Sequence, residues 1–71
     1  MKVHLKRFRF ENGDLTQQEL ADKVGVTRQT IISIERGKYK PSIELALRIA
    51  RLFRAPVEAV FELEEGSEET K

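Results

Sequence analysis

The sequence has no cysteine and no tryptophan, and only one histidine, His4, among its 71 residues. Without cysteine, neither disulfide bonds nor a thiolate zinc site can brace the fold, so hydrophobic packing must hold it together. One histidine is too few for a histidine-based metal site. A chain this short buries only roughly 60% of the surface that its unfolded form exposes, which argues against a two-lobed catalytic cleft. We therefore expect one small domain that is not an enzyme and uses no metal or other cofactor.

The sequence also lacks a long apolar run. No stretch reaches the about 18 apolar residues that a membrane helix needs. The first ten residues, MKVHLKRFRF, alternate charged and apolar side chains where a signal peptide would be continuously apolar. We therefore expect a soluble, cytoplasmic protein with no membrane contact.

Charge is nearly balanced overall, with 13 basic and 12 acidic residues, but it is unevenly distributed. Residues 1–61 hold 12 basic and 7 acidic residues, a net charge of +5, which is compatible with nucleic acid although many solvated surfaces carry as much. Residues 64–71, EEGSEETK, are expected to form a disordered acidic tail. The tail could keep the protein soluble, which we favour, or repel DNA, or bind a partner.

Local signals divide the chain into short helices. Gly13, Gly25 and Gly37 each follow a segment that could be helical, which is where a left-handed cap is common. Thr16 and Glu19 fit a capping box, in which each side chain bonds the backbone amide of the other. The capping box at Thr16 and the glycine at position 25 together predict a helix from about residue 17 to Gly25.

The next two helices also begin at caps. Thr27 can cap a helix over residues 28–36, and Ser42, after Pro41, can cap another over residues 43–53. Apolar positions of the helix over 43–53 cover more than half of its circumference. This helix is therefore expected to pack against several neighbours or against a second subunit.

Both ends of the domain are also predicted to be helical. Residues 57–61, VEAVF, are long enough for one last short helix. Near the start, Val3, Leu5, Phe8 and Phe10 fit either two alternating strand-like pieces or a helix with Leu5 and Phe8 on one face. We favour a helix because a lone strand would have no partner in a chain that is otherwise helical. The resulting prediction is an all-α domain.

Residues 28–36 form an amphipathic helix with an unusual outer face. At about 100° per residue, Ile31 and Ile34 lie together on the inner side. Gln29, Ser33 and Arg36 lie on the opposite side. Two short helices joined by a glycine turn form a helix-turn-helix, whose second helix lies in the DNA major groove. Polar side chains on its outer face would then be able to bond base edges.

The segment LTQQELADKVGVTRQTIISIERGKYKPSIELALRIARLF resembles the helix-turn-helix of the Cro and phage-repressor type, also named after the xenobiotic response element. The motifs LTQQELA, TRQTI and IERGKYKPS, the glycine turn and the following apolar helix occur in the family's order and spacing, and the resemblance covers about residues 5–61. It implies a compact five-helix, lambda-repressor-like domain, which we assign to residues 1–63. It also implies a transcription regulator of bacteria, archaea or phages that binds operator DNA, usually as a homodimer.

The resemblance assigns most of the predicted DNA contacts position by position, and side-chain chemistry and position add the others. Base contacts fall in or beside the second helix, at Arg28, Gln29 and Ser33, with Thr27, Thr30 and Ile32 beside them. Phosphate contacts fall at the start of the first helix and after the second, at Gln17, Gln18, Arg36, Lys38, Tyr39 and Lys40. The chemistry agrees, because glutamine can bond adenine, arginine can bond guanine or a phosphate, and isoleucine can meet a thymine methyl group. Tyr39 could instead pack under its loop.

Further expectations concern residues near these contacts. In some relatives the positions of Arg9 and Glu35 form a partly buried ion pair that ties the first helix to the third. Arg54 stands where relatives commonly have glycine, and Asp14 looks like an extra residue in the first loop. His4 is expected to be exposed and without a role.

A homodimer is expected because one such domain makes few phosphate contacts, and two half-sites about 34 to 36 Å apart double them. The expected interface combines the apolar flank of the helix over 43–53 with Val57, Val60, Phe61 and Leu63. The favoured function is a repressor that binds double-stranded operator DNA. Alternatives with the same fold are an antitoxin paired with a toxin, a controller of a restriction-modification system, and a coactivator-like module that binds proteins.

Overall fold

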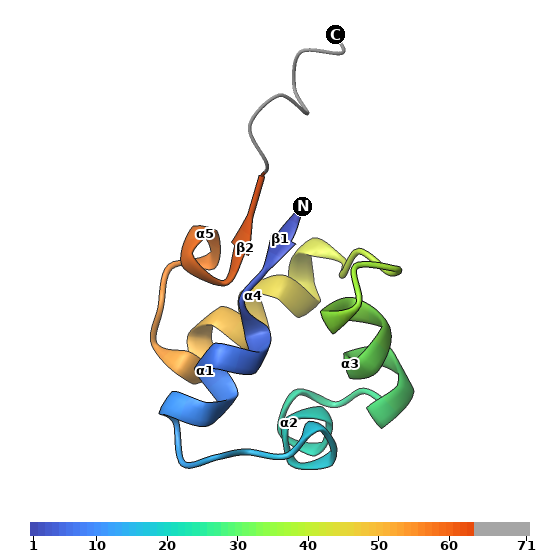
Figure 1. Cartoon of the computed structure of the whole chain (residues 1–71), viewed down its shortest axis with the longest axis vertical. Coiled ribbons are helices and arrows are strands. Elements are labelled where there is room, and N and C mark those ends of the chain that lie inside the picture. The colour runs from blue at the N-terminus through green and yellow to red at the C-terminus, as the bar shows by residue number, and fades with distance from the viewer. Residues whose placement is uncertain (64–71) are drawn as a thin grey trace, which may run out of the picture.

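The computed structural model describes residues 1–63, which form five helices and a two-stranded ribbon (Figure 1). The helices are α1 (Leu5–Glu11), α2 (Gln17–Val24), α3 (Arg28–Glu35), α4 (Ile43–Phe53) and α5 (Val57–Val60). The strands β1 (Lys2–Val3) and β2 (Phe61–Glu62) pair antiparallel. The predicted all-α, five-helix fold is confirmed, and the acidic tail predicted for 64–71 lies outside the described residues.

The predicted helix caps are present. The Thr16 hydroxyl accepts a hydrogen bond from the Glu19 amide at 3.0 Å, and the Glu19 carboxylate accepts one from the Thr16 amide at 2.9 Å. Thr27 and Ser42 accept from the amide three residues further on, at 3.2 and 3.1 Å. Each cap satisfies an amide that the first helical turn leaves without a partner, so α2, α3 and α4 begin where the sequence indicates.

Left-handed residues end two of these helices. Gly25 has a φ of +81°, and its amide donates to the Ala21 carbonyl at 2.8 Å, which ends α2 and turns the chain toward α3. Arg54 ends α4 with a φ of +55°, so it adopts the left-handed conformation although it is not glycine. Asp14, in the loop between α1 and α2, also has a positive φ of 57°. A side chain in this region costs about 1 to 2 kcal/mol, and aspartate tolerates it better than arginine.

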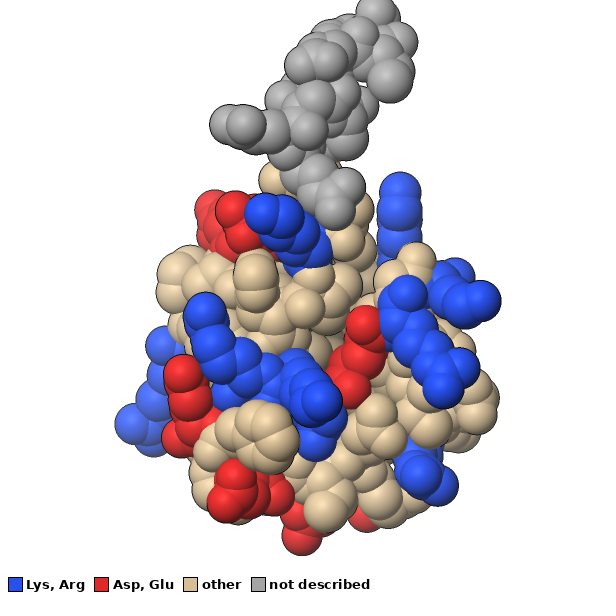
Figure 2. All heavy atoms as spheres, in the orientation of Figure 1, with Lys and Arg blue, Asp and Glu red and all other residues tan. Residues whose placement is uncertain are grey.

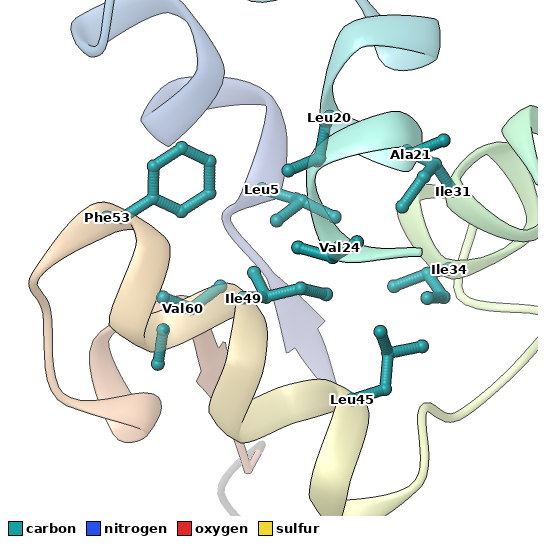
Figure 3. Close-up of a cluster of buried hydrophobic side chains, with 11 residues drawn as sticks. Leu5, Leu20, Ala21, Val24, Ile31, Ile34, Leu45, Ile49, Phe53 and Val60 are labelled. Carbon is teal, nitrogen blue, oxygen red and sulfur yellow. The ribbon is translucent and has the colours of Figure 1, made fainter. Parts of the chain in front are cut away.

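Charged side chains stand out on the face of the domain that Figure 2 shows, and one apolar cluster fills the inside (Figure 3). Every helix contributes to this cluster, through Leu5, Leu20, Ala21, Val24, Ile31, Ile34, Leu45, Ile49, Ala50, Phe53 and Val60. Burying a Val, Leu, Ile or Phe side chain contributes about 1.5 to 3 kcal/mol, so this cluster is the main source of stability in a chain without disulfides. It also fixes which side of α3 faces outward, because Ile31 and Ile34 are fully buried.

The prediction of helix throughout both ends is wrong at three residues. Lys2 and Val3 form β1, whose partner is β2 at the other end of the domain. Phe61 belongs to β2 and not to the last helix, because its backbone is extended, with φ −124° and ψ 116°. The strand therefore does have a partner, but that partner follows α5, where a helix was expected to continue.

His4 is likewise engaged in the ribbon. Its amide donates to the Val60 carbonyl at 2.9 Å, and its Nε2 lies 2.9 Å from a carboxylate oxygen of Glu62. The expectation that His4 is exposed and without a role is wrong, because His4 is half-buried and both its backbone and its side chain bond the other end of the domain. Its two bonds link the start of α1 to the end of α5 and to β2.

Candidate nucleic-acid interface

The outer side of α3 has the composition that was predicted for it. Arg28 and Gln29 are exposed at the start of the helix, and Arg36 is exposed just after its end. Ile32 and Ser33 are half-buried between them. Because Ile31 and Ile34 on the opposite side of the helix are buried in the core, the side chains of the outer side face away from the core and are available to a ligand.

Positive charge gathers along α3 and the loop that follows it, where Figure 2 shows blue side chains at the right. The cations are Arg28, Arg36, Lys38 and Lys40, and all four are exposed. None of them forms an ion pair within residues 1–63. Unpaired cations on one face attract a polyanion and are not neutralised by the protein itself.

The loop after α3 bends back over the helix. Gly37 has a φ of +75°, and the Lys38 amide donates to the Ser33 carbonyl at 2.9 Å. Tyr39 is 48% exposed and lines a hollow of about 210 Å³ with Thr27, Gln29, Thr30 and Ser33. We call this the Tyr39 hollow. The tyrosine ring thus lies beside the predicted base-contacting residues, and its hydroxyl has no hydrogen bond to the described part of the chain.

Several predicted contact residues already bond to other side chains. Gln17 donates from Nε2 to Glu35 at 3.0 Å, and Gln18 donates from Nε2 to Asp22 at 2.9 Å. An amide nitrogen carries two hydrogens, so each glutamine keeps one donor for a phosphate. Thr27 and Thr30 bond each other through their hydroxyls at 3.0 Å as part of the α3 cap. These bonds hold the four side chains at the two helix starts.

The expected ion pair between Arg9 and Glu35 is present. Arg9 donates from Nε at 2.8 Å and from a terminal nitrogen at 3.1 Å to the two carboxylate oxygens of Glu35. It also donates to the Leu15 carbonyl at 2.9 Å. The side chains of Arg9 and Glu35 are only 10% and 12% exposed. Arg9 therefore joins α1, the first loop and α3, and it neutralises the carboxylate of α3.

The expected dimer surface needs one correction. Val60 is fully buried in the monomer core, so its side chain offers nothing to a second subunit. Val57 and Phe61 are half-buried and Leu63 is 74% exposed. On α4, the exposed apolar side chains are Ile43 at 79% and Leu47 at 53%.

A further hollow, which the sequence did not indicate, lies on the other side of α3. It measures about 510 Å³ and lies between α1, the start of α2 and α3. Its lining includes Lys6, Gln17, Arg28, Ile32, Glu35 and Arg36, and we call it the α1–α3 hollow. Lys6 was missed because no local signal places it beside the distant residues of α3.

Within residues 1–63, no three histidine, aspartate or glutamate side chains lie close enough together to hold a metal ion. The same part of the chain contains no helix that is both long enough and apolar enough to cross a membrane.

Comparison with known proteins places these features in a family. Residues 5–60 match the helix-turn-helix family. A protein of Methanothermobacter thermautotrophicus, named as an HTH-type transcriptional regulator, is 54% identical over 66 residues, which cover 92% of this chain and 94% of the relative. A regulator of the same description from Archaeoglobus fulgidus is 51% identical over 61 residues, 86% of each chain. A cryptic phage CTXphi transcriptional repressor of Vibrio cholerae is 32% identical over 44 residues, 62% of this chain and 40% of the repressor.

Proposed function

The chain belongs to the helix-turn-helix family of the Cro and phage-repressor type, a family of transcription regulators and not of enzymes, and we propose that it represses transcription by binding an operator. The observation that carries the proposal is the outer side of α3, where polar and cationic side chains are exposed while Ile31 and Ile34 hold the helix in the core. Repression is supported by the similarity to the Vibrio cholerae phage repressor. Operator binding would take place in the cytoplasm.

In this proposal α3 enters the major groove and its outer side chains contact base edges. Gln29 is suited to adenine, to which an amide can make two hydrogen bonds, and Arg28 is suited to guanine or to a phosphate. Ser33 bonds either kind of base, and Ile32 meets a thymine methyl group. Thr27 and Thr30 lie at the edge of this contact, where their hydroxyls already bond each other.

Phosphate contacts on both sides of α3 would fix its depth in the groove. On one side lie Lys38, Tyr39 and Lys40, in the loop that the Lys38 amide ties back to α3. On the other side lie Gln17 and Arg36, and Gln18 follows Gln17 at the start of α2. Gln17 is held by a hydrogen bond to Glu35 and Gln18 by one to Asp22. Such contacts position the protein and supply much of the affinity, while base contacts supply sequence preference.

We propose that the protein binds as a homodimer, since the two-fold symmetry of a dimer matches two half-sites about 34 to 36 Å apart. The exposed apolar side chains of α4 support this proposal, because they offer a surface for the second subunit. Leu47 on α4 and Val57 on α5 line one hollow of about 580 Å³, and Ile43 is exposed on the same helix as Leu47. Phe61, which is half-buried, and Leu63, which is exposed, are proposed to take part in the same contact. Sedimentation of the protein with and without DNA tests the proposal, and a monomer on DNA at every concentration would contradict it.

The proposed function is tested by selection from a random pool of duplex DNA at near-physiological salt. Wild type is expected to enrich a palindrome with half-sites about one helical turn apart. Gln29→Ala is expected to enrich the same palindrome with one base position relaxed, since a two-bond contact discriminates by about 1 to 3 kcal/mol.

Gln18→Ala is the matched control, because it removes the same side chain from a proposed phosphate contact and should weaken binding without relaxing any position. If wild type enriches no sequence and binds only weakly in a salt-sensitive way, the operator proposal is wrong.

A further inference from the structure

We propose that Lys6 of α1 contacts a DNA backbone phosphate in the α1–α3 hollow, so that the DNA-binding surface extends beyond the helix-turn-helix. The inference rests on the proposed function, because it assumes that α3 lies in the major groove. It adds a contact from a helix to which neither the sequence pattern nor the predicted contacts assign any role with DNA.

The two hollows beside α3 give the first argument. Arg28, Ile32 and Arg36 are spaced four residues apart and line the α1–α3 hollow, and Gln29 and Ser33 line the Tyr39 hollow on the other side. The exposed part of α3 is therefore a ridge between two depressions. A major groove about 12 Å wide is bounded by two backbones. With the ridge in the groove, one backbone faces the Tyr39 hollow and the other faces the α1–α3 hollow.

Charge gives the second argument. Lys6, Arg28 and Arg36 line the α1–α3 hollow, and none of them forms an ion pair within residues 1–63. One carboxylate, that of Glu35, also lines it. That carboxylate already accepts two hydrogen bonds from Arg9 and one from Gln17. The negative charge of Glu35 is thus compensated by Arg9 from the protein interior. Three unpaired cations therefore remain for an anion that enters the hollow from solvent.

The position of Lys6 gives the third argument. Its neighbour Leu5 is fully buried in the core, and Lys6 itself is exposed at the start of α1. The start of α1 is held by the bond from the His4 amide to the Val60 carbonyl at 2.9 Å. Val3, one residue earlier, is paired with Phe61 and lines the same hollow. The ribbon therefore presents Lys6 at the edge of the hollow before DNA arrives.

The experiment measures affinity for the selected operator as a function of salt, for wild type and for Lys6→Gln, Lys6→Arg and Lys23→Gln. Lys23 is an exposed lysine on α2 outside the α1–α3 hollow, so it is the matched control. Each lost phosphate contact lowers the slope of log K against log salt by about 0.9. Lys6→Gln is expected to lose about that amount for each bound protomer and to weaken binding equally for all sequences. Lys6→Arg and Lys23→Gln should keep the wild-type slope.

A second measurement identifies the phosphate. The operators for this measurement carry a neutral methylphosphonate in place of one phosphate at a time. At one backbone position per half-site, this replacement should weaken the binding of wild type. At the same position it should not weaken the binding of Lys6→Gln any further. Because each protein is compared with itself on the natural and the modified operator, a lower stability of the variant affects both values equally.

Failure of the inference and failure of the proposed function give different results. If wild type binds the operator but Lys6→Gln keeps the slope of Lys23→Gln, Lys6 makes no phosphate contact and the operator proposal stands. If wild type shows no operator binding at all, both proposals are overturned.

Discussion

The carboxylate of Glu35 accepts two hydrogen bonds from the guanidinium of Arg9, at 2.8 and 3.1 Å, across 26 positions of sequence. The pair connects the first helix of the domain to the helix that carries the proposed base contacts. The same carboxylate accepts a bond from Gln17 at the start of α2. A single acidic side chain of α3 therefore bonds to both α1 and α2, in addition to the core contacts of Ile31 and Ile34.

Replacing Arg9 alone should be strongly destabilising. Arg9→Leu leaves the carboxylate of Glu35, which is 12% exposed, without its cationic partner. Removing one partner of a buried pair costs about 3 to 5 kcal/mol. The expected result is a loss of that size in the free energy of unfolding, measured by urea denaturation.

The double variant Arg9→Leu with Glu35→Leu is the control, because it removes both charges together. It should be clearly more stable than Arg9→Leu alone, since apolar side chains of similar volume can replace a buried ion pair at little cost. Equal stability of the single and double variants would show that the ion pair is not the source of the effect.

The pKa of Glu62 should depend on His4. The hydrogen bond from His4 is the main cause that holds the pKa of Glu62 below its ordinary value of 4.5, with smaller contributions from the charges of Lys2 and His4. Because this pKa is lowered in the folded state, the contact stabilises the fold above about pH 4.5, and the stabilisation is lost as the pH falls through the lowered pKa. A carboxyl NMR titration of His4→Ala should show the pKa of Glu62 moved up toward 4.5. An unchanged titration in that variant would contradict the assignment.

Replacing Arg54 by glycine should stabilise the protein. Arg54 has a φ of +55° at the end of α4, and glycine adopts this conformation without the cost that a side chain brings. Arg54→Gly should raise the free energy of unfolding by about 0.5 to 1 kcal/mol, which corresponds to a rise in Tm of roughly 2 to 8 °C. Asp14→Gly, at a φ of 57°, is the comparison, and its gain should be smaller because aspartate tolerates this region. A fall in the Tm of Arg54→Gly would mean that its side chain makes a contact worth more than the backbone strain.

Val60 and Leu47 should behave in opposite ways. Val60→Ala removes two buried methyl groups and leaves a cavity, so it should lower the free energy of unfolding by about 2 kcal/mol and leave the oligomeric state unchanged. Leu47→Glu places a charge on a side chain that is 53% exposed, so it should leave the monomer folded and break the proposed dimer. Denaturation of both variants measures the loss of stability, and sedimentation measures the loss of dimerisation. If Leu47→Glu is still a dimer, the interface does not include this part of α4.

Local signals account for the parts of the fold that could be predicted. The capping box at Thr16, the cap at Thr27 and the turn at Gly25 each depend on a few neighbouring residues, so the bounds of α2 and α3 followed from the sequence. The alternation of Ile31 and Ile34 with polar residues likewise identified the outer side of α3. The contacts proposed for that side remain predictions.

The two ends could not be predicted because their structure depends on distant partners. Val3 becomes a strand residue only because Phe61 lies beside it, and neither residue carries a local signal for the pairing. Val60 was assigned to a surface because its segment is apolar, which is equally true of a core residue. Lys6 was missed for a similar reason, because its place at the α1–α3 hollow depends on α1 lying beside α3, which is distant in the sequence.

The ribbon also gives the domain an order of unfolding. His4 and Glu62 are separated by 58 positions, and closing so long a loop costs entropy that only the packed helices can offset. Strands of two residues each add few bonds of their own, so the ribbon belongs to the part of the structure that opens first and forms last. The two termini of the domain should therefore exchange their amide hydrogens together and faster than α2 and α3, as one unit made of opposite ends of the chain.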